Sequence, residues 1–430
     1  MAGSRCLPLI DRVDGGALFL RPSGPVETGA FLQDVAMLAA RLPPGGHLVN
    51  LCVDRYAFAV GFAAGLVSGR TSLLNLELAH AAARFPGCVV LADASMACAL
   101  PFVLVQPQGQ GDGGPVPAVP ADHLAAIVFT SGSTGVPMGH AKHWGELVAR
   151  SRAAAAQFGM KSGSVLGMVP PQHMYGFETT VLLPLHAPVG SWCGPAFFPA
   201  DVAAALPSCP APRTLVTTPL QLRSLVAAGT ALPLGAVISA TAPLDPALAG
   251  QAEALWGAPV LEIFGATEVG SIASRRSTAG PDWRVYPGVD VSITSDGTMV
   301  RAEGTEAVPL ADLLEAVPGG FRLLGRRTDV VKMGGRRASL LGLNQVLTGL
   351  PGVDDGAFVV PEDLERRSTA RLVAVVVAPD RSGDAILADL RRVVDPVFMP
   401  RRVIRVDALP RNAMGKLPRQ ALLDLVASHP

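Results

Sequence analysis

The chain has 430 residues, of which 49% are hydrophobic and 16% charged, so it can bury a large core and is long enough for two domains. Its 35 Lys and Arg residues balance 35 Asp and Glu residues, which leaves no basic excess for nucleic-acid phosphates or an anionic membrane surface. The longest apolar stretch, residues 56–67, is too short to span a bilayer.

The six cysteines are scattered without CxxC pairing: Cys6, Cys52, Cys88, Cys98, Cys193 and Cys209. This spacing favours small buried hydrophobic residues in a reducing compartment over a disulfide framework or a zinc site. The first 16 residues lack the charged and then apolar order of a signal peptide. We therefore expect a cytoplasmic protein.

In the N-terminal quarter, short apolar runs alternate with helical patterns. We expect helices at residues 28–41 and 56–68, and strands at residues 47–53 and 87–91. Strands separated by helices indicate an α/β layered fold with parallel strands. Residues 106–119 are rich in Gly, Gln and Pro and are expected to form a surface loop.

The most informative stretch is TSGSTG, which follows an apolar run at residues 124–129 that predicts a buried strand. Glycine adopts positive φ, so successive N–H groups can turn inward around an anion, and the hydroxyls add donors. A polyphosphate is the predicted ligand; an ordinary Ser/Gly turn is the alternative. The loop residues are Thr130, Ser131, Gly132, Ser133, Thr134 and Gly135.

A helix is expected at residues 144–157, with anions favoured near its N-terminal side. The loop does not match the Walker pattern, because Met138 and Gly139 stand where a lysine and a hydroxyl are needed. Lys142 could supply the missing positive charge through its flexible stem. A solvated surface lysine is the alternative for Lys142.

Further along, residues 237–244 predict a strand that ends in small residues, and residues 261–268 predict another strand followed by a Thr-Glu pair. Residues 283–294 and 297–301 are expected to be hairpin strands of a smaller β layer. A β-rich run at residues 371–378 and an amphipathic helix at 385–394 fit a small α/β unit near the C-terminus.

Three later motifs follow the TSGSTG loop in a fixed order: FGATE, GRRTDVVKMGGRR and LPRNAMGK. Together the four resemble adenylate-forming enzymes, namely acyl- and aryl-acid–CoA synthetases, peptide-synthetase adenylation domains and luciferases. The resemblance implies an α/β fold with a large N-terminal domain, residues 1–326, made of layered α/β subdomains and a small β layer. It also implies a small mobile C-terminal α+β lid, residues 327–430.

The resemblance also implies roles around ATP. The loop would hold the phosphates, small residues would lie against the adenine, Phe264 would stack on it, and the ribose would be bound through its hydroxyls. The implied residues are Ala242 and Pro243 for adenine, and Asp312 and Arg326 for ribose or phosphate. Leu310 and Ala311 replace the usual Thr-Gly before Asp312, so a surface aspartate is the alternative there.

For the chemistry, the resemblance implies that the Thr267 hydroxyl meets the α-phosphate and that Glu268 binds Mg²⁺. A helix cap is the alternative for an isolated Thr-Glu pair. Lys416 would meet the carboxylate and the α-phosphate, and the lid would then swing about Thr328. Gly335 would lie beside the tunnel for the incoming thiol.

The acid pocket is expected near the stretch PPQHMYGFE, where the resemblance implies a His- and Gly-bearing loop that opens a helix. The implied lining residues are His173, Tyr175, Phe177, Glu178 and Gly265. The aromatic residues suit an aryl or medium-length apolar acid. Glu178 could instead pair with the amine of an amino acid, hydrogen-bond a hydroxyl, or cap a helix.

The implied activity is an ATP-dependent acid–thiol ligase that loads a small carboxylic acid onto CoA or a phosphopantetheinyl carrier protein. Its expected cofactors are ATP and Mg²⁺, with CoA or phosphopantetheine as the thiol acceptor. Two alternatives stay open. One is a stand-alone amino-acid adenylation enzyme, and the other is a nucleotide-binding pseudoenzyme or regulatory partner, suggested by the departures at Met138 and Thr328.

Overall fold

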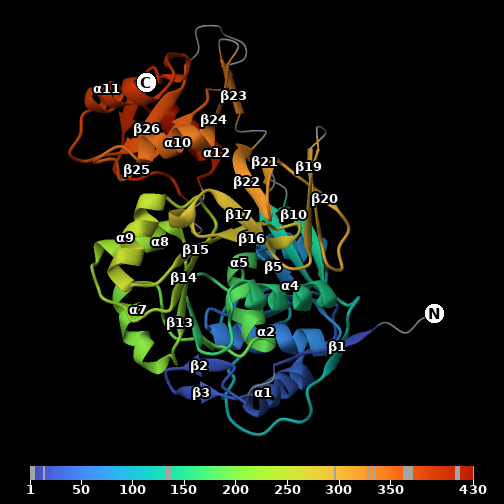
Figure 1. Ribbon diagram of the computed structural model, residues 1–430. Coiled ribbons are helices and arrows are strands. Elements are labelled where there is room, and N and C mark those ends of the chain that lie inside the picture. The colour runs from blue at the N-terminus through green and yellow to red at the C-terminus, as the bar shows by residue number, and fades with distance from the viewer. Residues whose placement is uncertain are drawn as a thin grey trace.

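The computed structural model describes residues 5–12, 15–131, 137–294, 297–326, 330–333, 336–361, 371–411 and 417–429. Strands and helices alternate along the chain and form layers, as Figure 1 shows. The expected class, a mixed α/β protein with a large N-terminal and a small C-terminal part, is confirmed. Within the described ranges, no helix combines the length and apolar character needed to cross a membrane.

The first sheet has six described strands in the order β10-β9-β5-β4-β6-β7. They are β4 (His47–Asn50), β5 (Thr71–Leu74), β6 (Val89–Ala92), β7 (Phe102–Leu104), β9 (Leu124–Ser131) and β10 (Pro137–His143). Neighbours are parallel except β9 and β10, which form an antiparallel hairpin. The sequence does not predict β10, because PMGHAKH has no alternation of apolar and polar residues.

The second sheet has eleven described strands in the order β21-β22-β17-β16-β15-β14-β13-β11-β12-β2-β3. Their bounds are β2 (Phe19–Arg21), β3 (Gly24–Val26), β11 (Ser164–Gly167), β12 (Gly190–Trp192), β13 (Arg213–Thr217), β14 (Ala236–Ser239), β15 (Val260–Ala266), β16 (Gly270–Arg275), β17 (Asp282–Val285), β21 (Asp312–Val317) and β22 (Gly320–Arg326). The six neighbouring strands β15, β14, β13, β11, β12 and β2 are parallel, whereas the pairs beyond β15 and the edge pair β2–β3 are antiparallel.

Helices fill the space between the two sheets and cover their outer faces. The middle layer holds α1 (Thr28–Arg41), α2 (Arg55–Val67), α4 (Trp144–Gln157), α5 (Met174–Phe177), the π-helix Glu178–Leu182 and α6 (Leu183–His186), which share one buried cluster with both sheets. The outer layers hold α3 (Leu78–Arg84) on the first sheet and α7 (Pro199–Ala205), α8 (Pro219–Ala227) and α9 (Pro246–Trp256) on the second.

Most N-terminal elements match their sequence expectations. The helices expected at residues 28–41 and 144–157 have those bounds as α1 and α4. The strand expected at residues 47–53 ends at Asn50, because Asp54 then caps α2 by accepting a hydrogen bond from the Ala57 N–H at 2.7 Å.

A small sheet of β18 (Val289–Thr294), β19 (Gly297–Ala302) and β20 (Val308–Leu310) packs beside the second sheet. The expectation of one strand over residues 283–294 is wrong. A turn closed by the Val289 N–H and the Tyr286 carbonyl, 3.1 Å apart, separates β17 from β18. Strand β17 then joins the second sheet instead of the small one.

The C-terminal part begins with the hairpin β23 (Val330–Met333) and β24 (Arg336–Ser339), followed by α10 (Leu340–Thr348). Its sheet contains β25 (Asp355–Val359), β26 (Val373–Val377) and β27 (Val403–Arg405), flanked by α11 (Gly383–Val393) and α12 (Arg419–Ala427). The expected strand and helix at residues 371–378 and 385–394 are thereby confirmed. Helix α10 packs beside β22, so this part sits at one end of the second sheet (Figure 1).

Candidate functional site

Helix α5 and the segments that follow β14 and β15 meet at one edge of the second sheet. This is the carboxyl edge of the parallel strands β11, β13, β14 and β15, where ligands bind in open α/β sheets. Tyr175, on α5, anchors this edge. Its hydroxyl lies 3.0 Å from both the Thr217 carbonyl on β13 and the Ile238 carbonyl on β14. The hydroxyl is therefore used within the protein, and only the half-buried ring remains available to a ligand.

The segment after β14, residues 240–244, carries an unusual backbone conformation. Thr241 has φ +79°, which a β-branched residue rarely adopts and which is typical of strain held at functional sites. Ala242 and Pro243, the predicted adenine contacts, come next and are half-buried and exposed respectively.

A buried ion pair supports the same segment from β15 and β16. The Glu262 carboxylate accepts a hydrogen bond from the Leu244 N–H at 3.0 Å and another from Arg275 Nε at 2.6 Å. Glu262 is only 4% exposed; burial raises its pKa, and Arg275 opposes that shift. The Arg275 guanidinium also lies over the Trp283 ring, 4.5 Å from its centroid.

Phe264 and Gly265 lie at the end of β15. The Phe264 ring packs against Trp283 and Phe321, with centroids 5.6 and 5.4 Å apart, so its orientation is supported by two other aromatic rings. At Gly265 a Cβ would lie 2.7 Å from the Gly270 carbonyl, so the β15–β16 crossing requires glycine there.

The predicted phosphate loop begins at the end of β9, where Ser131 pairs with Pro137 across the β9–β10 hairpin, and its residues 132–135 lie outside the described ranges. On this hairpin the Thr130 hydroxyl lies 3.2 Å from His140 Nε2. Burial lowers the pKa of His140. The imidazole therefore favours its neutral form, which can accept a hydrogen bond from the hydroxyl.

Lys142, on β10, is not a surface lysine, because it is only 2% exposed. Its ammonium donates to the main-chain carbonyl of Glu268 at 2.5 Å. Burial lowers the pKa of Lys142, while Glu146, Glu178 and Glu268 oppose that shift. The amine expected to serve the loop phosphates is thus engaged with the Thr267–Glu268 turn.

The N-terminus of α4, where anions are expected to be favoured, lies at the far end of β10 from the predicted phosphate loop. Strand β10 has seven residues and separates the two by about 20 Å. The first N–H groups of α4 are also occupied: Trp144 donates to the His123 carbonyl at 2.9 Å, and Gly145 donates to the Ala121 carbonyl at 2.8 Å.

Glu178 begins the π-helix and is 6% exposed. Its carboxylate accepts a hydrogen bond from the Ser271 hydroxyl at 2.6 Å and lies 3.4 Å from the Ser271 N–H. Burial raises its pKa, and Ser271, Lys142 and Arg150 oppose that shift. Gly270 has φ +95°, and a Cβ there would meet Glu178 Oε1 at 2.4 Å, so the carboxylate lies directly against the β16 backbone.

The other two predicted pocket residues lie in different environments. His173 is half-buried at the N-cap of α5. Phe177 is fully buried, with its ring 4.8 Å from Phe62 and 6.4 Å from Phe58 between the two sheets. The structure therefore gives Phe177 a packing role and does not bring it to the carboxyl edge with Tyr175.

Asp312 and Arg326, the predicted ribose contacts, are directly opposite each other in the β21–β22 pair. Asp312 is half-buried.

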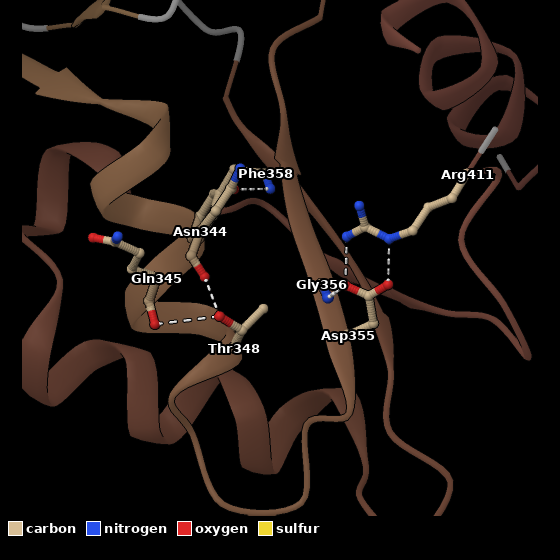
Figure 2. A network of polar contacts seen from close by, with 7 residues as sticks. All are labelled: Asn344, Gln345, Thr348, Asp355, Gly356, Phe358 and Arg411. Carbon is tan, nitrogen blue, oxygen red and sulfur yellow. Dashed lines mark hydrogen bonds and ion pairs between the residues drawn. The ribbon is translucent and has the colours of Figure 1, made fainter. Parts of the chain in front are cut away.

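The described part of the lysine-bearing motif ends at Arg411, which donates from Nε and Nη2 to the two Asp355 carboxylate oxygens, each at 2.7 Å (Figure 2). Asn344 accepts from the Phe358 N–H at 2.7 Å and ties α10 to β25.

Several predicted site residues lie outside the described ranges: Gly132, Ser133, Thr134, Gly135, Thr328, Gly335 and Lys416. Thr267 and Glu268 are described. They form the turn between β15 and β16, with Thr267 half-buried and Glu268 exposed.

Sequence reasoning misses His140, Glu262 and Ser271, which hold the predicted segments in place. An acidic residue inside the apolar strand LEIF is a usable signal for Glu262, because a charge there must be paired once it is buried. His140 and Ser271 have no such signal, since their neighbours in space come from distant parts of the chain.

Comparison with protein families identifies both parts of the chain. A model described as AMP-binding enzyme matches residues 55–312, and one described as AMP-binding enzyme C-terminal domain matches residues 343–416. The chain is 31% identical over 322 residues to a 4-coumarate–CoA ligase of Halorhodospira halophila, covering 71% of this chain and 78% of the relative. It is 28% identical over 337 residues to a probable 2-succinylbenzoate–CoA ligase of Mycobacterium tuberculosis, covering 70% and 84%.

Solved structures share the fold. ATP-bound MatB from Rhodopseudomonas palustris matches with a TM-score of 0.80 at 20% identity, covering 97% of this chain and 96% of MatB. The o-succinylbenzoate CoA synthetase MenE from Bacillus subtilis, in complex with its acyl-adenylate intermediate, matches with a TM-score of 0.78 at 18% identity, covering 96% and 95%. This chain belongs to the AMP-binding enzyme family, within the adenylate-forming superfamily that its four motifs resemble.

Proposed function

We propose that this chain is an AMP-forming acid–thiol ligase. It activates a small carboxylic acid with ATP and then transfers the acyl group to a thiol. One observation carries the proposal most directly. In a member of the AMP-binding enzyme family, Lys142 joins the hairpin with the Ser/Gly loop to the Thr267–Glu268 turn through a 2.5 Å hydrogen bond.

In the first half-reaction, an oxygen of the substrate carboxylate attacks the α-phosphorus of ATP, and the bond to pyrophosphate breaks. Catalysis requires alignment and neutralisation of charge more than proton transfer. The loop residues 130–135 hold the β- and γ-phosphates, the Thr267 hydroxyl donates to the α-phosphate, and Lys416 meets both reacting groups. Residues 242–243, Phe264, Asp312 and Arg326 hold the nucleoside.

Glu268 is the proposed Mg²⁺ ligand, and its chemistry fits. Its carbonyl is held by Lys142 while its side chain is exposed, so a hard carboxylate oxygen is available at the edge of the site. The described residues contain no group of three or more His, Cys, Asp and Glu side chains placed to hold a metal. This suits an ion bound through one carboxylate and substrate phosphates, where it would offset phosphate charge.

In the second half-reaction, a thiolate attacks the acyl carbon and AMP leaves as the thioester forms. We propose that the C-terminal part, residues 327–430, rotates about Thr328 between the two steps and that Gly335 then borders the thiol path. CoA is the favoured acceptor, since the relatives found by sequence are named CoA ligases. A phosphopantetheinyl carrier protein is the other candidate.

An aryl or medium-length apolar acid is the proposed substrate class. The Tyr175 hydroxyl is used by main-chain carbonyls, so its ring offers an apolar surface. Three of the relatives are named for aromatic acids: 4-coumarate, 4-chlorobenzoate and 2-succinylbenzoate. The buried bond between Glu178 and Ser271 gives no support to an amino-acid substrate that needs this carboxylate for its amine. Cys52, Cys88, Cys98, Cys193 and Cys209 are free thiols, which suits the proposed location in the cytoplasm.

The test is acid-dependent exchange of labelled pyrophosphate into ATP over a panel of aryl and alkyl acids, followed by thioester formation with CoA or a carrier protein. We expect Lys416→Ala to slow exchange by about 100-fold or more while ATP binding changes little. Lys161→Ala, at an exposed lysine outside the four motifs, is the control and should exchange normally. ATP binding without exchange for any acid would instead support the nucleotide-binding pseudoenzyme.

A further inference from the structure

The turn between β15 and β16 is held from two sides by buried side chains of opposite charge. Lys142 holds its first half through the Glu268 carbonyl, at 2.5 Å. Glu178 contacts the start of β16, directly after the turn, by accepting a hydrogen bond from the Ser271 hydroxyl at 2.6 Å. Both bonds are formed by charged groups, which make stronger hydrogen bonds than neutral ones.

The two charged residues come from elements far apart in the sequence. Lys142 lies on β10, which continues directly from the Ser/Gly loop, and Glu178 lies on the π-helix of the middle layer. A π-helical turn is rare and is frequent at functional sites. Lys142 and Glu178 are 2% and 6% exposed, so each would carry a large desolvation cost without the other charge nearby.

The turn is also restrained by the pairing of Ala266 with Gly270 and by the side chain of Val269, which is 3% exposed. Between its two ends the Val269 N–H donates to the Ala266 carbonyl at 3.0 Å. Gly265 and Gly270, on either side, have no side chains that could pack and fix it. The side chain of Glu268 is exposed, so its position depends on its own backbone.

From this geometry we infer that Lys142 and Glu178 form a clamp that fixes the position of Thr267 and Glu268, and that Lys142 is a positioning residue instead of a ligand of the nucleotide. The clamp deepens the proposed function and rests on it for the roles of Thr267 and Glu268. Because Lys142 lies on the loop hairpin, the clamp also fixes the distance between the predicted phosphate loop and the turn.

The test uses three single variants of the full chain: Lys142→Met, Glu178→Gln and, as a control, Lys161→Met at an exposed lysine. Hydrogen–deuterium exchange over residues 262–275 reports the turn directly and needs no substrate. We expect exchange in this segment to become about tenfold faster in the first two variants and to stay unchanged in the control. Unchanged exchange in both clamp variants would overturn the inference.

Steady-state kinetics then separate positioning from binding. A clamp predicts that Lys142→Met lowers kcat for pyrophosphate exchange by about tenfold or more, with the KM for ATP within about threefold of the parent. A tenfold rise in the KM for ATP at unchanged kcat would show that Lys142 binds the nucleotide. An unchanged kcat per folded molecule, with only the melting temperature lowered, would show a merely structural role. Both results contradict the inference.

Failure of the proposed function gives a different pattern. The parent protein would then show no exchange of pyrophosphate with any acid, whereas the hydrogen–deuterium exchange of the variants would still decide whether the clamp exists. The double variant Lys142→Met with Glu178→Gln adds a further check. It removes both charges together, so it should melt at a higher temperature than Lys142→Met alone while the turn stays loosened.

Discussion

Asp312 lies directly opposite Arg326 in the antiparallel β21–β22 pair. Asp312 is the first residue of β21 and Arg326 the last of β22, so both belong to the same end of one hairpin. The two residues proposed to hold the ribose therefore come from neighbouring strands, although 13 positions separate them in the sequence. Their pairing makes the ribose assignment testable with single substitutions.

Asp312→Ala should weaken ATP binding. A carboxylate that accepts hydrogen bonds from ribose hydroxyls contributes about 1.5–3 kcal/mol, so the KM for ATP should rise by about 10- to 100-fold. The KM for the acid should change little. Asp290→Ala is the matched control, because Asp290 is exposed and pairs with Arg301 on the small sheet. An unchanged KM for ATP in Asp312→Ala would contradict the proposed contact with the ribose.

Glu262→Ala should destabilise the protein and weaken ATP binding together. It leaves Arg275 without its buried partner, which costs about 3–5 kcal/mol, and it frees the segment at residues 240–244 that carries the proposed adenine contacts. Thermal melting and the KM for ATP measure the two effects. Asp282→Ala, which breaks a half-exposed pair with Arg322, should change the melting temperature and the KM for ATP only slightly. Loss of stability with an unchanged KM would contradict the proposed role of the segment.

Asp355→Asn should lower the adenylation rate with a small effect on stability. Asp355 holds Arg411, which directly precedes residues 412–416 in the sequence and so anchors the start of the segment with Lys416 (Figure 2). We expect kcat for pyrophosphate exchange to fall by about tenfold. Asp389→Asn is the control, because Asp389 forms a comparable pair with Arg381 in the same part of the fold. Equal rates in the two variants would contradict a positioning role.

His186 should make the protein less stable in mild acid. Burial lowers its pKa to about 4, and its Nδ1 lies 3.1 Å from the Leu182 carbonyl, which fixes the neutral tautomer. The unfolded chain, with a histidine pKa near 6.5, binds a proton that the folded chain excludes. Stability should therefore fall by about 1.4 kcal/mol per pH unit as the pH drops from about 6.5 toward 4.

The measurement is the melting temperature of the parent and of His186→Leu between pH 7 and pH 4. The variant should lose less stability than the parent across that range, because it lacks the buried group that must gain a proton. His429→Gln, at an exposed histidine, should follow the parent. Parallel curves for the parent and His186→Leu would contradict the assignment.

Local pattern alone predicts the elements whose structure depends on nearby residues. The bounds of α1 and α4 follow from apolar spacing, and the buried strand before the Ser/Gly loop follows from an unbroken apolar run. Strand β10 escapes prediction because its pairing with β9, and not its own composition, makes it a strand. The separation of β17 from β18 is also missed, because it depends on which sheet each strand pairs with and not on local composition.

In the candidate site, too, local motifs are predicted from the sequence and long-range contacts are not. The four motifs predict which segments matter, and the structure brings the segments after β14 and β15 and helix α5 to one edge of the second sheet. The sequence does not predict that Lys142 is buried, because its contacts with Glu268 and its electrostatic partner Glu178 depend on long-range packing. Phe177 differs from its expected role because its ring faces Phe58 and Phe62 in the middle layer.

The buried amine of Lys142 has a consequence for how the β9–β10 hairpin can vary. A slip of one residue between β9 and β10 would move every side chain of β10 to the opposite face and turn this ammonium away from its acceptor. The buried hydrogen bond of Lys142 thus favours one pairing register of β9 with β10.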